Sequence, residues 1–225
     1  MSIAPSRVEE IQNLVIHQLK QHWLKVDEYS IKKYVPLALN EMEENIKACN
    51  IPRLYNNGVI IFSEYHSVTW MIFLYRLSHL LGKIGGVNEC ADMVYYLNKI
   101  MHGIDWYHQI ELPIHFLAEH PLGSVLGRAK YGDYFFVYQG TTVGGNRKDG
   151  ILCYPQIGNN VIMYANSSII GDSKIGDNVI ISANTTIMNE IVPDNCLVFG
   201  KSPNLIIRKK GIDYIGKMNS HIWKN

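Results

Sequence analysis

A large aliphatic residue recurs at every sixth position in the last third of the chain, and no other sequence feature constrains the fold as strongly. An amphipathic helix repeats its apolar face about every 3.6 residues and a half-buried strand about every two, so a period of six fits strands and not a helix. The repeating positions are Ile157, Met163, Ile169, Ile175, Ile181 and Ile187.

A second register within the same repeat predicts a parallel β-helix. In such a fold each six-residue unit makes one short strand and a corner, three units close a triangular coil, and the aliphatic residue points inward. Asn, Asp and Gly suit the corners because they tolerate left-handed backbone. An ordinary β-sandwich with chance spacing is the alternative. The small or β-branched residues four places after each aliphatic are Val161, Ser167, Ser173, Val179, Thr185 and Ile191.

The chain divides into two domains by its patterning. Residues 1–103 carry apolar residues at helical spacing, as in "SRVEEIQNLVIHQL", and the apolar segment "HSVTWMIFLYRLSHLLGKIGG" ends on glycines that can stop a helix. We expect a β-helix over residues 104–207 and a basic tail over residues 208–225. The predicted fold class is therefore α+β, with a helical N-terminal domain followed by the β-helix.

An extended loop is expected over residues 144–156. An earlier six-residue register runs through Val125, Tyr131, Val137 and Val143, and the next inward residue, Ile157, follows Val143 after 14 residues instead of a multiple of six. The loop "GGNRKDGILCYPQ" should therefore project from the triangular stack of coils. Long loops on a regular scaffold usually carry function.

Composition excludes several classes of protein. A net charge of +1 over 225 residues gives no global attraction to nucleic acid or to a membrane surface. The N-terminus reads as an amphipathic helix and not a signal peptide, and no 18-residue apolar stretch predicts a membrane span. We expect a cytoplasmic protein without a metal site, because four cysteines lack paired or metal-ligand spacing. They are Cys49, Cys90, Cys153 and Cys196.

Two motifs resemble the serine O-acetyltransferase family of hexapeptide-repeat acyltransferases. They are "GIDWYHQIELPIHFLAEHPLGSVLG" and "QGTTVGG", and the resemblance covers about residues 104–207. Asp105 and His120 stand 15 residues apart, as the family's catalytic carboxylate and histidine do. The resemblance implies a left-handed β-helix, acetyl-CoA as co-substrate, and a homotrimer whose pairing into a hexamer stays open.

The chemistry of such a pair can be argued from the residues. A hydroxyl group is a poor nucleophile at neutral pH, and histidine is the usual base with a pKa near the working pH. A carboxylate on the other imidazole nitrogen would fix the tautomer. We therefore expect His120 to act as general base and Asp105 to orient it, with direct attack of the acceptor on the thioester. A plain surface imidazole at a β-helix corner is the alternative for His120.

The predicted acceptor site departs from the family pattern. Glu119 stands where the family has an aspartate that helps bind the acceptor amine. Cys153 and Tyr154 stand where the family has an Arg-His pair that holds the acceptor carboxylate. Arg147 and Lys148 are the nearest replacement cations in sequence, or else solvated loop charges. Tyr154 is the candidate contact for a neutral sugar.

Small residues suggest a path for the pantetheine arm. Gly145, Ala165 and Ala183 match the family's small residues there, and the two alanines are 18 residues apart, which is one coil. Tight coil packing explains either alanine equally well. The nucleotide phosphates could meet basic residues, although these could also be simply solvated. The basic residues are Lys201, Lys209 and Lys210.

The sequence thus predicts an acetyl-CoA-dependent O-acetyltransferase. The resemblance makes L-serine the first acceptor, giving O-acetyl-L-serine for cysteine biosynthesis. An acetyltransferase acting on a sugar or other small hydroxyl compound of surface-polysaccharide synthesis is the alternative. A non-catalytic hexapeptide scaffold is a third reading, against which the presence of both Asp105 and His120 argues.

Overall fold

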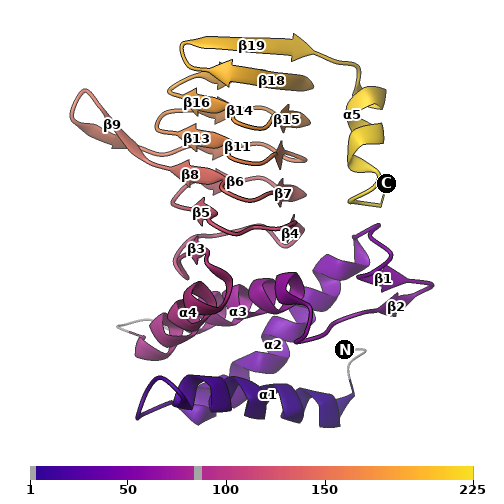
Figure 1. Ribbon diagram of the computed structural model, residues 1–225, viewed down its shortest axis with the longest axis vertical. Coiled ribbons are helices and arrows are strands. Elements are labelled where there is room, and N and C mark those ends of the chain that lie inside the picture. The colour runs from indigo at the N-terminus through magenta and orange to yellow at the C-terminus, as the bar shows by residue number, and fades with distance from the viewer. Residues whose placement is uncertain (1–3, 84–87, 225) are drawn as a thin grey trace.

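A layer of helices supports a triangular stack of β-strands in the computed structural model of the protein, which describes residues 4–83 and 88–224 (Figure 1). The four N-terminal helices lie together at one end, and the strands rise from them coil by coil. The helices are α1 (Pro5–Lys20), α2 (Glu28–Lys47), α3 (Ser67–Gly82), α4 (Glu89–His102) and, near the C-terminus, α5 (Ile212–Asn219).

Local sequence signals set the helix ends. The Asp27 side chain accepts a hydrogen bond from the Ser30 amide and so caps α2. Asn88 caps α4 in the same way, through the Ala91 amide. The last turn of α4 ends on Gly103, whose φ of 63° is the left-handed conformation that favours glycine. The chain then turns directly into the first strand of the β-helix.

The strands form three faces, each a parallel ladder of successive coils. One face is β3-β5-β8-β13-β16, the second is β4-β7-β12-β15-β18 and the third is β6-β11-β14-β17. Outside these faces, β1 (Tyr55–Asn56) and β2 (Val59–Ile60) form a small hairpin in the helical region. The remaining strands are β3 (Asp105–Trp106), β4 (Phe116–Ala118), β5 (Val125–Leu126), β6 (Lys130–Tyr131), β7 (Phe135–Val137), β8 (Thr142–Gly144), β9 (Asn146–Lys148), β10 (Ile151–Cys153), β11 (Gln156–Ile157), β12 (Ile162–Met163), β13 (Ser168–Ile170), β14 (Lys174–Ile175), β15 (Val179–Ile181), β16 (Thr186–Met188), β17 (Ile191–Val192), β18 (Cys196–Lys201) and β19 (Asn204–Lys209).

The inward column predicted from the repeat is confirmed. Ile169 pairs with Ile187, which follows it by 18 residues in the next coil. It also pairs with Val143 in the coil before, at a separation of 26 residues, because the β9–β10 hairpin intervenes. All six repeating aliphatic residues are buried. Burial of such side chains is worth about 1.5–3 kcal/mol each, which makes this column the main stabilising element of the domain.

The predicted earlier register was wrong at one position. Val125 is 41% exposed, whereas its neighbour Leu126 is buried and pairs with Val143. Successive residues of a strand point to opposite faces, so a shift by one residue exchanges inside for outside. The shift arises because only five residues separate Leu126 from the next inward residue, Tyr131, whereas the repeat has six.

Asparagines occupy the corners in left-handed conformation, as the sequence predicted. Asn166 and Asn184 have φ values of 58° and 61° and lie one coil apart. A second ladder follows another corner, where Asn160 donates to Asn178 and Asn178 donates to Asn195. The side-chain amides thus add to the backbone hydrogen bonds that link successive coils at this corner.

The excess residues after Val143 leave the prism as a hairpin. Strands β9 and β10 pair antiparallel, with Asn146 opposite Cys153. The hairpin projects sideways from β8 before the chain rejoins the prism at β11 (Figure 1).

The final residues cap the β-helix and then return to the helical region. Strand β19 pairs antiparallel with β18, and the expected boundary between residues 207 and 208 falls inside β19. Helix α5 then runs back along the side of the prism (Figure 1). Trp223 makes a bridge to Cys49, and the Asn50 amide donates to the Ile222 carbonyl. The segment 220–224 is therefore docked against residues 48–50.

Among the helices of the described residues, none has the combination of length and hydropathy needed to cross a membrane.

Stability should fall as the pH drops below about 6.5, because burial lowers the pKa of three histidines in the helical region. These histidines are His66, His79 and His102. The folded state holds them neutral while the unfolded chain binds the protons, so stability is present above the unfolded pKa and is lost on acidification. Calorimetry should show a lower Tm at pH 5.5 than at pH 7.5. His102→Gln should reduce this difference, and an unchanged difference would contradict the assignment.

Candidate functional site

His120 projects from an enlarged corner of the first complete coil. From Ala118 to Val125 the chain takes seven steps, whereas the paired residues one coil above, Val137 and Thr142, are separated by five. His120 itself adopts a φ of 50°, an uncommon conformation for a residue with a side chain. Such backbone strain concentrates at functional sites. The imidazole is exposed and has no hydrogen-bond partner among the described residues.

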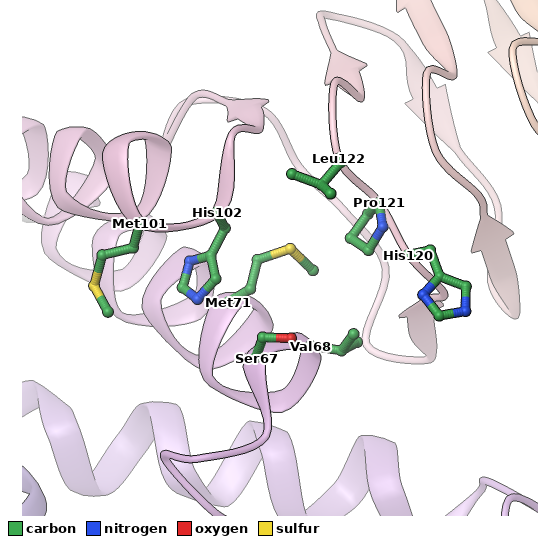
Figure 2. A pocket seen from close by; sticks show the side chains of 8 residues that line it. All are labelled: Ser67, Val68, Met71, Met101, His102, His120, Pro121 and Leu122. Atoms are coloured by element: carbon green, nitrogen blue, oxygen red, sulfur yellow. The ribbon is translucent and has the colours of Figure 1, made fainter.

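A cavity of about 270 Å³ opens between this corner and the helical layer (Figure 2). His120 lies at one side of it and His102, from the last turn of α4, at the other, with Met71 and Leu122 between them. The cavity lining is mainly apolar, and consists of Ser67, Val68, Met71, Met101, His102, His120, Pro121 and Leu122.

His102 is fixed within this cavity wall. Its Nδ1 lies 2.7 Å from the Asn98 Oδ1, and burial lowers the pKa of His102. It is therefore a neutral imidazole at neutral pH. The described part of the chain contains no group of three or more His, Cys, Asp or Glu side chains that could hold a metal ion.

Asp105 has partners other than His120. Its two carboxylate oxygens accept from the Tyr95 hydroxyl at 2.7 Å and from the Lys99 ammonium at 2.6 Å. Burial acts to raise the pKa of Asp105, but these two hydrogen bonds outweigh it and lower the pKa.

The strand register explains this difference from the expected Asp-His pair. Gly123 donates to Gly103, so these two glycines mark the same corner in successive coils. Asp105 follows that corner on β3, whereas His120 precedes it. No hydrogen bond joins Asp105 to His120 in the described residues, and the orienting role of Asp105 stays a prediction.

Glu119, next to His120, is held in an ion pair that sequence reasoning missed. Its Oε1 accepts from the Arg53 guanidinium at 2.8 Å, and its Oε2 accepts from the Tyr138 hydroxyl at 3.2 Å. The hydrogen bond from Arg53 is the main reason why the pKa of Glu119 is lowered. Arg53 lies 66 residues earlier, just before the β1–β2 hairpin, and no local pattern marks it.

Two stacked tyrosines lie next to this ion pair, along the edge of the β-helix that also carries Glu119 and His120. The Tyr138 and Tyr164 rings lie 5.0 Å apart with planes 15° from parallel. Burial, followed by the charge of Glu119, raises the pKa of Tyr138 to about 12. Tyr138 therefore keeps its proton and donates to Glu119 at any ordinary pH.

Two of the three small residues predicted for the pantetheine path, Ala165 and Ala183, share the edge with His120, whereas Gly145 lies at another corner, beside Tyr154. Tyr138 donates its amide to Met163, and Tyr164 to Ile181, so the residues that follow each tyrosine also stack. His120, Gln139, Ala165 and Ala183 thus form one column along the edge. Lys201 lies at the end of this edge, since it pairs with Thr186.

Lys209 and Lys210 lie at a different corner from Lys201. In the β18–β19 ladder Lys201 pairs with Asn204, whereas Lys209 pairs with Cys196 at the other end. A strand rises about 3.3 Å per residue, so roughly 16 Å separate these ends. The structure therefore does not gather the three lysines predicted to meet the phosphates into one site.

The predicted loop residues lie at another corner of the same chain. Arg147 donates to the Gly150 carbonyl within the hairpin, and Lys148 lies 3.7 Å from Asp172. The Tyr154 ring packs on Gly145, where an added Cβ would come within 2.8 Å of it. This corner joins the β8 and β11 faces, whereas His120 lies between the β4 and β5 faces. Within the chain the predicted loop residues and His120 therefore lie at different corners.

Comparisons with known proteins agree with this architecture. Residues 154–189 match the family model described as bacterial transferase hexapeptide (six repeats). A serine acetyltransferase of Staphylococcus epidermidis is 34% identical over 132 residues, which are 58% of this chain and 61% of that protein. The matched region spans about half to three fifths of the length of such curated relatives.

Solved structures of serine acetyltransferases share the fold. One from Brucella abortus strain S19 superposes with a TM-score of 0.70 at 21% identity, covering 92% of this chain and 85% of that one. Another, in complex with CoA, gives a TM-score of 0.62 at 17% identity, covering 80% of this chain and 75% of that one. The β-helix of this chain thus has the left-handed form built from hexapeptide repeats.

Proposed function

We propose that this chain, which carries the hexapeptide repeat and resembles serine acetyltransferases in sequence and fold, transfers an acetyl group from acetyl-CoA to a hydroxyl group. One observation carries the proposal. His120 projects from a strained corner beside a cavity, at the foot of the edge that holds Ala165 and Ala183. The proposed base, His120, and the proposed path of acetyl-CoA along Ala165 and Ala183 therefore lie on one edge of the β-helix.

The proposed reaction needs one proton transfer and one acyl transfer. His120 accepts the proton of the acceptor hydroxyl as its oxygen attacks the thioester carbonyl, and the sulfur of CoA leaves as the acceptor ester forms. The imidazole is exposed and makes no hydrogen bond to the described residues, so it can bind that hydroxyl. Asp105 would assist only if it exchanged its bonds to Tyr95 and Lys99 for one to His120.

The small edge residues fit the donor. The Ala165 side chain is half-buried and that of Ala183 is exposed, so an extended pantetheine arm could approach the backbone there. Lys201 at the end of the edge is the best placed of the three lysines to meet a phosphate. A homologous fold solved with CoA supports acetyl-CoA as the donor.

Two classes of acceptor remain, each with its own support. L-serine is indicated by the names of the relatives. An uncharged hydroxyl compound such as a sugar is favoured by the Arg53–Glu119 ion pair, which neutralises the carboxylate expected to bind an amine.

We also propose a homotrimer, because the loop residues reach the His120 corner only from another copy. Whether two trimers associate into a hexamer stays open. The proposed location is the cytoplasm, where acetyl-CoA is available, with no role for nucleic acid, membrane or metal.

Thiol release from acetyl-CoA tests the proposed function. The purified protein should release CoA only when a hydroxyl acceptor is added, with L-serine and simple glycosides tested side by side. A matched control omits the acceptor and measures hydrolysis alone. Absence of release above this control with every acceptor would favour the non-catalytic scaffold and refute the proposal.

A further inference from the structure

We infer that Arg53 determines acceptor specificity by neutralising Glu119, so that the site selects a hydroxyl acceptor without an ammonium group, of the glycoside class. The inference rests on the proposed acetyl transfer and names its second substrate. It concerns a residue outside the β-helix that lies beside the catalytic corner only in the folded chain.

Glu119 has no free carboxylate oxygen in this arrangement. One oxygen accepts from Arg53 and the other from Tyr138. The Glu119 side chain is only 27% exposed, so water replaces these partners less readily than at the surface. An incoming ammonium group would have to share these oxygens with the two existing donors or displace one of them, and the bond from Arg53 is charge-assisted and of normal length.

Arg53 also repels the group that Glu119 was expected to bind. A positive acceptor group beside Glu119 would lie within a few ångströms of the guanidinium, and a like charge at that distance is a means of rejecting a competing ligand. Arg53 is 52% exposed and donates only one of its N–H groups among the described contacts. The remaining donors suit the hydroxyl oxygens of an uncharged acceptor.

The stacked tyrosines supply the apolar half of such a site. Tyr138 touches Glu119 directly, and Tyr164 lies parallel to it one coil further along the edge. Both rings are half-buried and therefore partly accessible. Aromatic faces beside a few fixed polar groups are typical of sites for small ligands. The two tyrosine rings and the ion pair together suit a sugar ring, which has both C–H faces and hydroxyl groups.

The docked segment 220–224 holds Arg53 in this position. The Asn50 side chain donates to the Ser220 carbonyl at 2.5 Å, and the Lys224 amide donates to the Ala48 carbonyl at 2.9 Å. The Lys224 ammonium also lies 3.2 Å from the centroid of the Tyr55 ring. These contacts fix the chain on both sides of Arg53, so this segment acts as a positioning element for the acceptor site.

Acceptors that differ in charge test the inference. We would compare kcat/KM for methyl α-D-glucopyranoside and methyl α-D-galactopyranoside (uncharged), ethanolamine (ammonium), 3-hydroxypropionate (carboxylate) and L-serine (both). The wild-type protein should favour a glycoside. Arg53→Gln should raise kcat/KM for ethanolamine relative to the glycosides about tenfold or more, because Glu119 regains a free charge. Glu119→Gln should raise kcat/KM for 3-hydroxypropionate relative to the glycosides by a similar factor.

The controls separate the inference from the proposed function. Lys25→Gln removes an exposed positive charge far from His120 in sequence and should leave every ratio unchanged. A wild-type protein that prefers L-serine or ethanolamine to both glycosides would overturn the inference, and so would unaltered ratios in Arg53→Gln. Acetyl transfer itself would stand in both cases. A protein that transfers to no acceptor would overturn both.

The positioning role has its own variants. Asn50→Ala should shift the acceptor ratios in the same direction as Arg53→Gln, with KM for acetyl-CoA unchanged. Trp223→Ala should shift them further if the variant folds, since Trp223 belongs to this segment and its side chain is buried. Changes in KM for acetyl-CoA alone, or no change in acceptor ratio, would contradict a role for the segment in positioning Arg53.

Discussion

His120→Ala is expected to lower kcat for acetyl transfer by about 10²–10⁴-fold, which is the usual contribution of a positioned general base. The exposed corner needs no histidine for its packing, so the Tm should stay close to that of the wild type. KM for acetyl-CoA should also change little, because the proposed donor path lies along Ala165 and Ala183. Steady-state thiol release with calorimetry on the same preparations measures all three quantities.

Two further variants define what the His120 result means. His17→Ala replaces an exposed histidine of α1 and should have full activity. Asp105→Asn should also reduce turnover if Asp105 orients His120 during the reaction. If it acts only through Tyr95 and Lys99, the loss should appear in Tm instead of kcat. An undiminished rate in His120→Ala would remove the base from the mechanism.

Ile181→Ala should reduce the free energy of unfolding by about 2–5 kcal/mol, since it opens a cavity in a closely packed core. Ile181 is fully buried and pairs with Met163 below and Val198 above, so no side chain can move in without disturbing two coils. Urea unfolding followed by circular dichroism gives the value. Met188→Ala is the matched control, because that side chain lies 41% exposed on a neighbouring strand.

Equal losses in Ile181→Ala and Met188→Ala would contradict the inward column. A loss confined to Ile181→Ala would fit the burial of the six-residue register, in which each aliphatic supports the coils on both sides. Stability in stacked repeats is carried by such nearest-neighbour interfaces.

The β-helix was largely predictable from sequence because its contacts follow a fixed spacing. Residues 18 apart stack regardless of what the rest of the chain does, as Ile169 and Ile187 show. The corners were predictable because Asn166 and Asn184 adopt a backbone conformation that few other residues tolerate. The error at Val125 arose where the spacing itself changes, since the step from Leu126 to Tyr131 is five residues instead of six.

The features of the candidate site likewise divide into those that the sequence predicts and those that depend on tertiary structure. The six-residue repeat by itself determined that Ala165 and Ala183 stack on one edge, because they are one coil apart. That His120 shares this edge was decided by the structure, since the enlarged corner and the hairpin break the period between them. The partners of Asp105 and Glu119 were decided by tertiary structure, which brings Lys99 of α4 and Arg53 of the helical region against the first coils. Such contacts join segments with no common period, and the energy of a charged side chain depends on which partner the packing delivers. The sequence therefore determined the scaffold and indicated His120 as the proposed base, and only the tertiary structure decided which edge His120 shares and the charge of the acceptor site.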